Sequence, residues 1–222
     1  MRYQAVFFDC DGVLVDSEPI SLQVLRQMLA KRGWELSALA CKELFLGRAA
    51  SDWPEIIKTH GPFEVEAEWL TAYRLKRQQA LKQQIKAVPG IHEALKQISK
   101  HWPRRLACVS AARREKIMVQ LDTLGLTHFF APHIFSGADV ARNKPYPDVY
   151  WAACEGFGLT GAECAVIEDS LTGIRAAVEA GTIVYAYTRY IHAAEALAEG
   201  ASYAFDDMQR LPELLLNTRA RV

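Results

Sequence analysis

The chain alternates between short apolar runs and longer segments with the apolar spacing of helices. The apolar runs predict strands at 5–8, 105–109, 134–135, 165–167 and 183–186. The segments between the later runs predict helices at 91–99, 113–124, 148–157 and 171–180. Strands that alternate with helices are typical of a doubly wound parallel sheet with helices on both faces. We therefore predict an α/β core.

The segment that follows the first apolar run has a different pattern. No strand is evident from Ser17 to about Gln84, and helical spacing predicts helices that begin near Pro19 and continue at 38–45, 52–59 and 65–84. We predict an all-helical cap domain at 16–87, inserted into a core formed by 1–15 and 88–222. Because the insertion follows the first strand directly, the cap is expected where a lid over a site would lie.

Two acidic residues end the first predicted strand. Asp9 and Asp11 follow the apolar run and are followed at once by Gly12. Ligands of open α/β sheets bind at the carboxyl ends of the strands, and two neighbouring carboxylates repel each other unless a cation lies between them. This arrangement suits Mg²⁺, which prefers carboxylate oxygens, although Asp and Gly are also common in plain turns.

Three later segments supply groups that could handle a phosphate. Ser110 ends the second predicted strand and precedes a helix, so it predicts either an anion cradle or a helix N-cap. Lys144 lies in a proline-stiffened loop, where it could neutralise a phosphoryl oxygen or lie on the surface. Glu168 and Asp169 end another predicted strand, where they could share a cation with Asp9 or favour the helix N-terminus that follows.

These segments together resemble the haloacid dehalogenase superfamily, in the branch with a helical cap after the first motif. The matching residues are Asp9-x-Asp11-Gly12-x-Leu14-x-Asp16-Ser17, Ser110, Lys144-Pro145, and Glu168-Asp169-Ser170 with Gly173. The resemblance covers nearly the whole chain. It implies a Rossmann-like three-layer core and Mg²⁺-dependent phosphoryl transfer, and the most similar groups are sugar-phosphate phosphatases, phosphoglycolate phosphatases and β-phosphoglucomutase-like enzymes.

The resemblance also implies a role for each motif. Asp9 is expected to be the nucleophile that forms an aspartyl-phosphate, and Asp11 the general acid and base. Expected metal ligands are Asp9, the Asp11 backbone carbonyl, Asp169 and Glu168. Expected contacts to the phosphate oxygens come from Ser110, the Ala111 N–H and Lys144.

The predicted substrate is a small phosphorylated metabolite, such as a sugar or sugar-acid phosphate, which the sequence does not identify. Arg48 lies in a Gly-led loop of the cap at 45–52, and it is expected either to contact a distal hydroxyl or carboxylate of the substrate or to be a surface residue. Arg113 could replace a substrate contact that Ala111 and Ala112 do not offer.

Hydrolysis is preferred over a mutase reaction. Mutases of the family carry His five residues after the last Asp of the first motif, and the matching residue here is Ser21. Asp11 favours an oxygen leaving group, because the hydrolytic dehalogenases that name the superfamily do not have this second Asp.

Three other functions have partial support in the sequence. Cys108 and Arg114 have the Cys-x5-Arg spacing of thiol-dependent phosphatases, but Cys108 falls within a buried strand pattern. A non-catalytic phospho-ligand-binding protein would use the same fold. A basic stretch at 74–86 could suggest nucleic-acid binding, but its spacing suits a solvated helix face.

Composition agrees with a cytoplasmic enzyme. The 222 residues carry a formal net charge of zero, which gives no general attraction to nucleic acid or anionic membranes. The N-terminus has no signal-peptide pattern, and no apolar run approaches the ~18 residues of a membrane span. The five cysteines form no CxxC pair, which indicates reduced thiols. We expect a monomer, since no long apolar surface stripe is evident.

Overall fold

The structure is a computed structural model that describes residues 3–46, 48 and 52–217. The chain divides into two compact units. The core unit comprises Met1–Val15 with Lys86–Val222, and the cap unit comprises Asp16–Ile85. Each unit is described by itself.

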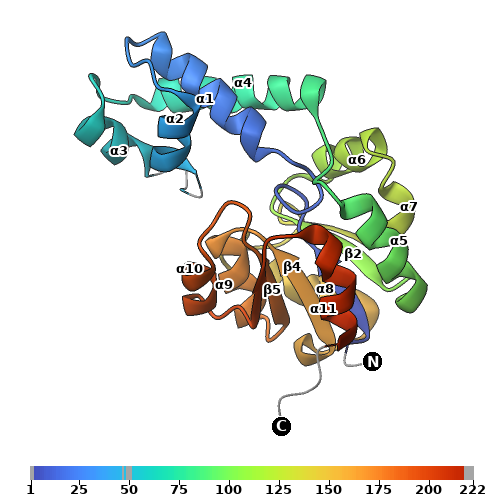
Figure 1. The fold of residues 1–222 in the computed structure, drawn as a ribbon. Helices are drawn as coiled ribbons and strands as arrows, with labels where there is room; N and C mark the ends of the chain where they lie inside the picture. Colours follow the sequence, from blue (N-terminus) through green and yellow to red (C-terminus); the bar gives the residue numbers. More distant parts are fainter. Residues whose placement is uncertain (1–2, 47, 49–51, 218–222) are drawn as a thin grey trace. The chain divides into compact units, whose positions relative to one another are not determined.

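A parallel sheet lies at the centre of the core unit (Figure 1). Within the described residues it has six strands: β1 (Ala5–Phe8), β2 (Leu106–Ser110), β3 (Ile134–Ser136), β4 (Cys164–Glu168), β5 (Ile183–Tyr187) and β6 (Tyr203–Phe205). Their order is β3-β2-β1-β4-β5-β6, so β1 lies between β2 and β4, and the direction of strand addition reverses there. A crevice forms at the carboxyl ends of strands at such a reversal, and ligands bind in it.

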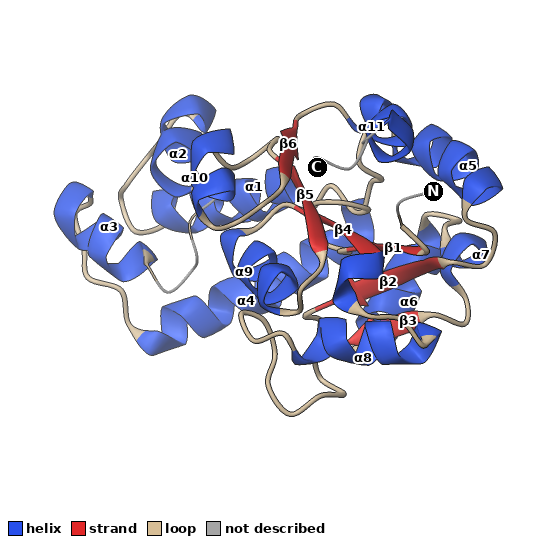
Figure 2. Ribbon diagram, turned by 90° about the horizontal axis from the view of Figure 1, so that it is seen from below, coloured by secondary structure: helices blue, strands red, loops and turns tan. Residues whose placement is uncertain are grey.

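Helices cover both faces of this sheet, as Figure 2 shows. They are α5 (Ile91–His101), α6 (Arg114–Thr123), α7 (Thr127–Phe130), α8 (Asp148–Phe157), α9 (Leu171–Glu179), α10 (Ala193–Ala198) and α11 (Leu211–Asn217). Successive residues of β1 face opposite layers, because side chains alternate along a strand. The Phe7 ring lies 5.6 Å from that of Phe157 in α8, whereas the Phe8 ring lies 5.8 Å from that of Phe130 in α7. The core unit therefore has the three layers expected of a Rossmann-like fold.

The central strand is fully buried and in register with both neighbours. Phe7 pairs with Ala107 on β2 and with Val166 on β4. All four residues of β1 are inaccessible to solvent, and burial of each Phe contributes about 1.5–3 kcal/mol. The Asp9 N–H donates to Ile167 O at 3.0 Å, so the residue directly after β1 is still tied to the sheet.

The cap unit consists of α1 (Glu18–Ala30), α2 (Ala38–Phe45), α3 (Trp53–His60) and α4 (Ala67–Gln84) in its described part. Proline in the first turn suits the start of α1, because a proline lacks an N–H that would otherwise have no helical acceptor. Edge-to-face contacts link Phe45, Trp53 and Tyr73, with ring centroids 5.8 and 4.7 Å apart. These aromatic residues join three of the four helices in one apolar core.

The structure adds elements at the end of the chain that the sequence analysis did not identify. The predicted strands ended at residue 186, but α10, β6 and α11 follow, and the short α7 precedes β3. Trp151 is half exposed on α8. Among the described residues, no helix combines the length and apolar character needed to cross a bilayer.

Candidate active site

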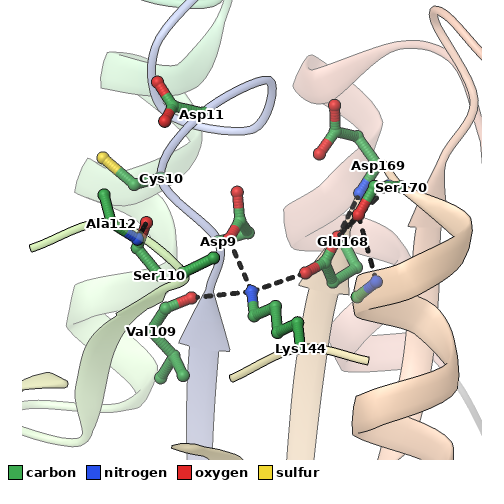
Figure 3. A network of polar contacts seen from close by, with 12 residues as sticks. Asp9, Cys10, Asp11, Val109, Ser110, Ala112, Lys144, Glu168, Asp169 and Ser170 are labelled. Atoms are coloured by element: carbon green, nitrogen blue, oxygen red, sulfur yellow. Dashed lines mark hydrogen bonds and ion pairs between the residues drawn. The ribbon is translucent and has the colours of Figure 1, made fainter. Parts of the chain in front are cut away.

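Predicted site residues meet at the carboxyl edge of the central strands (Figure 3). Asp9 directly follows β1, Ser110 is the last residue of β2, and Glu168 is the last residue of β4. Lys144 reaches them from the loop between β3 and α8. Residues up to 159 positions apart in sequence come together because parallel strands end at one edge of the sheet.

Lys144 lies at the centre of this group. Its Nζ atom lies 2.6 Å from Asp9 Oδ1 and 2.7 Å from Glu168 Oε1, and it donates to Val109 O at 3.1 Å. The side chain is 5% exposed. Burial alone would lower the pKa of Lys144, but the two carboxylates outweigh this and hold the pKa well above its usual value. Lys144 is therefore a permanent buried cation and not a surface residue.

Asp9 is destabilised as an anion despite this ion pair. Burial raises the pKa of its carboxyl to about 7, with a further increase from the Glu168 charge, while Lys144 acts in the opposite direction. One ammonium thus does not neutralise the carboxylates around it, so the site favours an additional cation.

Glu168 accepts hydrogen bonds through both carboxylate oxygens. Oε1 accepts from Lys144 Nζ and, at 3.0 Å, from the Tyr150 hydroxyl. Oε2 accepts from the Asp169 N–H, the Ser170 N–H and the Ser170 hydroxyl at 3.0–3.2 Å. Glu168 is fully buried, and these five donors compensate for its desolvation. It holds both Lys144 and the turn that carries Asp169.

A metal ion fits the group formed by Asp9, Glu168 and Asp169. One oxygen from each carboxylate lies within 4.8 Å of the others. The donors are all hard oxygens, which suit Mg²⁺ or a similar cation, and their mutual repulsion is relieved when a cation binds. Burial is the main cause of the raised pKa of Asp9, and the charge of Glu168 raises it further.

Two glycines permit the close approach of segments around this group. Gly12 has a φ of +92°, and a Cβ there would lie 1.8 Å from Asp169 Oδ2. A Cβ at Gly173 would lie 1.8 Å from Glu168 Oε1. A side chain at either position would displace a carboxylate of the acidic group.

The Ser110 hydroxyl binds within the loop that directly follows β2. The helix that follows begins at Arg114 and is preceded by Arg113, so the expectation that Ser110 caps this helix is wrong. Its hydroxyl instead accepts from the Ala112 N–H at 3.2 Å, which bends the chain back over the end of β2. Ser110 is buried and Ala111 is exposed directly after it.

Asn143 connects this loop to Lys144. Its Nδ2 atom donates to Ala111 O at 2.8 Å, and its Oδ1 atom accepts from the Lys144 N–H at 2.8 Å. Ser136 adds a second link, because its hydroxyl donates to Ala112 O at 2.7 Å. The residues expected to contact phosphate are thus held by one polar network.

Asp11 follows the same strand end but makes different contacts. Its carboxylate accepts from Lys116 Nζ and Gln120 Nε2, both on α6. The Asp11 side chain is therefore not part of the acidic group around Asp9. Arg113, expected to contact substrate, is exposed at the start of α6.

The other predicted substrate contact lies in the cap unit. Arg48 lines a hollow of about 250 Å³, in which Arg74 and Arg77 supply two further cations. The remaining lining residues are Glu18, Ser21, Leu22, Phe45, Trp53 and Tyr73. Gly47, Ala49, Ala50 and Ser51 of the predicted cap loop lie outside the described residues.

Ser21 occupies the position where mutases of this family carry His. Its hydroxyl donates to Ser17 O at 2.8 Å and accepts from Arg77 Nε at 2.6 Å. A hydroxyl held in this way offers no proton donor or acceptor comparable to an imidazole.

Several residues that hold the site together were not predicted from the sequence. Tyr150 falls within the helix predicted at 148–157, and Asn143 directly precedes Lys144, but neither was expected at the site. Lys116 and Gln120 carried no motif at all, although their i, i+4 spacing places them on one face of a helix.

A thiol mechanism is not supported. Cys108 lies inside β2 and its side chain is inaccessible to solvent. The thiol therefore cannot reach a phosphate, which agrees with its expected role as a small apolar residue.

Comparison with known proteins identifies the family. The sequence profile of haloacid dehalogenase-like hydrolases matches residues 3–181. The chain is 27% identical over 214 residues to the 6-phosphogluconate phosphatase of Escherichia coli K12. The matched region covers 96% of this chain and 95% of that protein. It is 24% identical over 220 residues to a phosphorylated carbohydrates phosphatase of Thermotoga maritima, which covers 99% of both chains.

A solved structure shows the same fold. A haloacid dehalogenase family hydrolase from Deinococcus radiodurans with bound phosphate and sodium superposes with a TM-score of 0.80, is 29% identical, and covers 97% of this chain and 95% of its own. The family profile spans both cap and core and includes all four groups of residues at the strand ends. The chain therefore belongs to the haloacid dehalogenase-like hydrolases, among relatives that are phosphoric monoester hydrolases.

Proposed function

We propose that this hydrolase removes phosphate from a small phosphorylated metabolite, a sugar or sugar-acid phosphate, with Mg²⁺ as its cofactor. The observation that carries the proposal is the group of Asp9, Lys144, Glu168 and the partly exposed Asp169 at the reversal point of the sheet. It combines a nucleophile, a fixed cation and metal ligands within one small volume. Phosphoryl transfer requires this combination, because its catalysis depends mainly on positioning and charge stabilisation.

Asp9 is the proposed nucleophile. Lys144 holds Asp9 Oδ1, so Oδ2 is the oxygen that attacks phosphorus. A bond forms between Oδ2 and phosphorus while the bond to the substrate oxygen breaks, which gives an aspartyl-phosphate and an alcohol. Water then attacks phosphorus, and inorganic phosphate and the free Asp9 carboxylate are released.

Asp11 is the proposed proton carrier. It donates a proton to the leaving oxygen in the first step and accepts a proton from water in the second. Its position two residues after the nucleophile, on the loop that ends β1, supports this role.

The remaining residues of the site are proposed to bind Mg²⁺ and the phosphate oxygens. Asp9, Asp169 and Glu168 would hold Mg²⁺, which when bound neutralises negative charge between nucleophile and phosphate. Lys144, Ser110 and the backbone at Ala111 are the proposed contacts for the phosphate oxygens. The hydrogen bonds of Asn143 to Ala111 O and from the Lys144 N–H keep these contacts in place before substrate binds.

The cap hollow supports a substrate with a second oxygen-rich or anionic group. Three arginines line it, and planar guanidinium groups bind carboxylates and phosphates with paired hydrogen bonds. The name of the Escherichia coli relative points in the same direction, since 6-phosphogluconate carries both a phosphate and a carboxylate. We propose Arg48 as the principal contact of this hollow to substrate.

Phosphate release from a panel of sugar and sugar-acid phosphates tests the reaction. The wild type is expected to release phosphate with Mg²⁺ but not with EDTA, and Asp9→Asn is expected to be inactive with an unchanged circular dichroism spectrum. Release of phosphate by Asp9→Asn at the wild-type rate would refute the proposed nucleophile. Isomerisation of sugar 1-phosphates without net phosphate release would establish a mutase instead.

A matched pair of substrates tests the substrate class. 6-Phosphogluconate and glucose 6-phosphate share a carbon skeleton but differ in the carboxylate. Arg48→Met is expected to lower kcat/KM for 6-phosphogluconate by about tenfold more than for glucose 6-phosphate, which corresponds to one charge-assisted hydrogen bond. Lys42→Met, on the exposed surface of α2, is the control. Equal effects on both substrates would remove Arg48 from this role.

A further inference from the structure

One face of α6 is directed at the Asp11 carboxylate. Lys116 and Gln120 lie one turn apart on this helix. Lys116 Nζ lies 2.5 Å from Asp11 Oδ2, and Gln120 Nε2 donates to Asp11 Oδ1 at 3.0 Å. Each carboxylate oxygen thus has its own donor from the same helix, which fixes both the position and the rotation of the carboxylate.

Gln120 is itself held in a fixed orientation. It is 4% exposed, which is unusual for a glutamine on a surface helix. Its Oε1 atom accepts from the Cys10 thiol at 3.5 Å, while its Nε2 atom faces Asp11. Because the oxygen and nitrogen ends have different partners, the amide can serve Asp11 only as a donor.

Lys116 completes the arrangement from a partly buried position. Its side chain is 31% exposed, and that of Asp11 is 26% exposed. Partial burial makes the ion pair stronger than one on the open surface, although water still reaches both groups.

The contacts keep Asp11 apart from the metal-binding carboxylates. In Figure 3, the Asp11 carboxylate is directed away from Lys144 and Glu168, whereas Asp9 points into the group that includes Asp169. A carboxylate that must carry a proton cannot also be a metal ligand through the same oxygen. A separate pair of donors is therefore a means of keeping the two carboxylates of the first motif in different roles.

We propose that Lys116 and Gln120 are positioning residues that aim Asp11 for proton transfer to the leaving oxygen. The inference rests on the proposed function, in which Asp11 is the general acid. Neither residue touches the substrate or the phosphate in this proposal. They act through Asp11, so their effect depends on how much the reaction needs its proton.

The leaving group distinguishes this role from a structural one. A sugar alkoxide is a poor leaving group and needs a proton from Asp11, whereas 4-nitrophenolate leaves readily without one. The parameter kcat/KM reports the steps up to the first irreversible one, the transfer of phosphate to Asp9, and excludes the later hydrolysis of the intermediate. The ratio of kcat/KM values for a sugar phosphate and 4-nitrophenyl phosphate therefore measures acid catalysis.

Lys116→Met and Gln120→Met are the two test variants, measured with the best sugar phosphate of the panel and with 4-nitrophenyl phosphate. Each is expected to lower this ratio by about tenfold, because a small misplacement of a catalytic group costs ~10–10²-fold in rate. Lys116→Arg should restore most of the ratio. Arg114→Met is the control. Arg114 is also on α6, its replacement removes a surface ion pair with Asp139, and the ratio should stay unchanged.

Combination with Asp11→Asn completes the test. Asp11→Asn alone should lower the ratio more than either variant, and Lys116→Met should then cause no further decrease, because there is no acid left to position. The inference is overturned if Lys116→Met and Gln120→Met leave the ratio unchanged or raise it, whether or not the two kcat/KM values fall together. It is also overturned if Lys116→Met lowers the ratio in the Asp11→Asn background as much as it does in the wild type. Failure of Asp11→Asn itself to change the ratio would instead overturn the acid role in the proposed function.

Discussion

The Lys144 ammonium lies 2.6 Å from Asp9 Oδ1, within a site from which solvent is almost excluded. The proposed nucleophile is therefore paired with a cation before any substrate or metal arrives. The pairing orients the carboxylate, and the second contact of Lys144, to Glu168, ties the ends of β1 and β4 together. One side chain thus stabilises the fold and prepares the chemistry.

Replacement of Lys144 by Met is expected to reduce both activity and stability. Two buried carboxylates lose their shared partner, and removal of one member of a buried ion pair costs about 3–5 kcal/mol. We expect kcat to fall by about 10²-fold or more, since a preorganised charge near phosphate is lost. Urea unfolding and phosphate release measure the two effects.

Addition of Mg²⁺ provides a control for Lys144→Met. Mg²⁺ should recover part of the lost stability of Lys144→Met, because it can replace the missing positive charge next to Asp9. A variant as stable as the wild type in EDTA would show that the ion pair contributes nothing to the fold.

Stability in EDTA should fall as pH rises from about 5 to 8. The pKa of Asp9 is about 7 in the folded protein against 3.8 for an ordinary Asp, so the folded state holds a proton that the unfolded state has lost. The stability that this proton provides is complete below the ordinary pKa and is lost as pH passes through 7. Thermal unfolding across this range measures the trend, which should be weaker in Asp9→Asn.

Mg²⁺ should show the opposite dependence. A metal ion binds the carboxylate only after the proton leaves, so the increase in Tm on addition of Mg²⁺ should be larger at pH 8 than at pH 5.5. The same increase at both pH values would mean that Asp9 does not take part in binding the ion.

Replacement of Gly12 by Ala should impair metal binding more than it impairs folding. The added Cβ would overlap Asp169 Oδ2 and would also occupy a left-handed backbone conformation at φ +92°. Gly33 is a matched control, because it has a φ of +82° with no atom within 4 Å of its added Cβ.

Both variants should lose about 1–2 kcal/mol from backbone strain. Only Gly12→Ala is expected to lose Mg²⁺ affinity and activity, by about tenfold or more, because a displaced ligand weakens the site. Mg²⁺ titration followed by Tm separates the two effects. An equal loss of affinity in Gly33→Ala would attribute the result to strain alone.

Asn143→Ala should affect catalysis more than stability. The side chain makes two hydrogen bonds, to Ala111 O and from the Lys144 N–H, that join the loop after β2 to the Lys144 loop. Loss of these contacts should cost about 1–2 kcal/mol in stability, because the position is partly exposed. We expect kcat to fall by about tenfold through misplacement of Lys144.

Arg142→Ala is the neighbouring control for this variant. It removes a surface ion pair with Asp148 and should leave kcat within about twofold of the wild type. If the two variants had the same kcat, the link through Asn143 would have no part in catalysis.

The arrangement of strands followed closely from the sequence, because buried parallel strands are strongly apolar and end at polar residues. The segment at 5–8 was predicted with its bounds, and Asp9 follows it as expected. The last strand, Tyr203–Phe205, was not recognised. The other edge strand, Ile134–Ser136, is equally short and was predicted, but two of its residues are buried, whereas only Phe205 is buried in the last strand. A short strand with little burial lacks the apolar run that separates a strand from a loop.

Residues that hold the site were harder to predict than residues that form it. Asp9 and Lys144 stood at strand ends or in stiffened loops, where chemistry is expected. Lys116 looked like any lysine on a solvated helix face, and Tyr150 like any buried aromatic. Their partners are 105 and 18 residues away, so only the folded topology brings these pairs together.

The two ends of the insertion are joined within the core unit. Val15 forms an antiparallel bridge with Ala87, and the Val88 N–H donates to Leu14 O at 3.0 Å. The chain therefore leaves the core and returns to it through one short stem, and the sheet register does not depend on what lies between. A stem of this kind lets the inserted unit change in sequence or length while the strand ends of the core unit keep their positions.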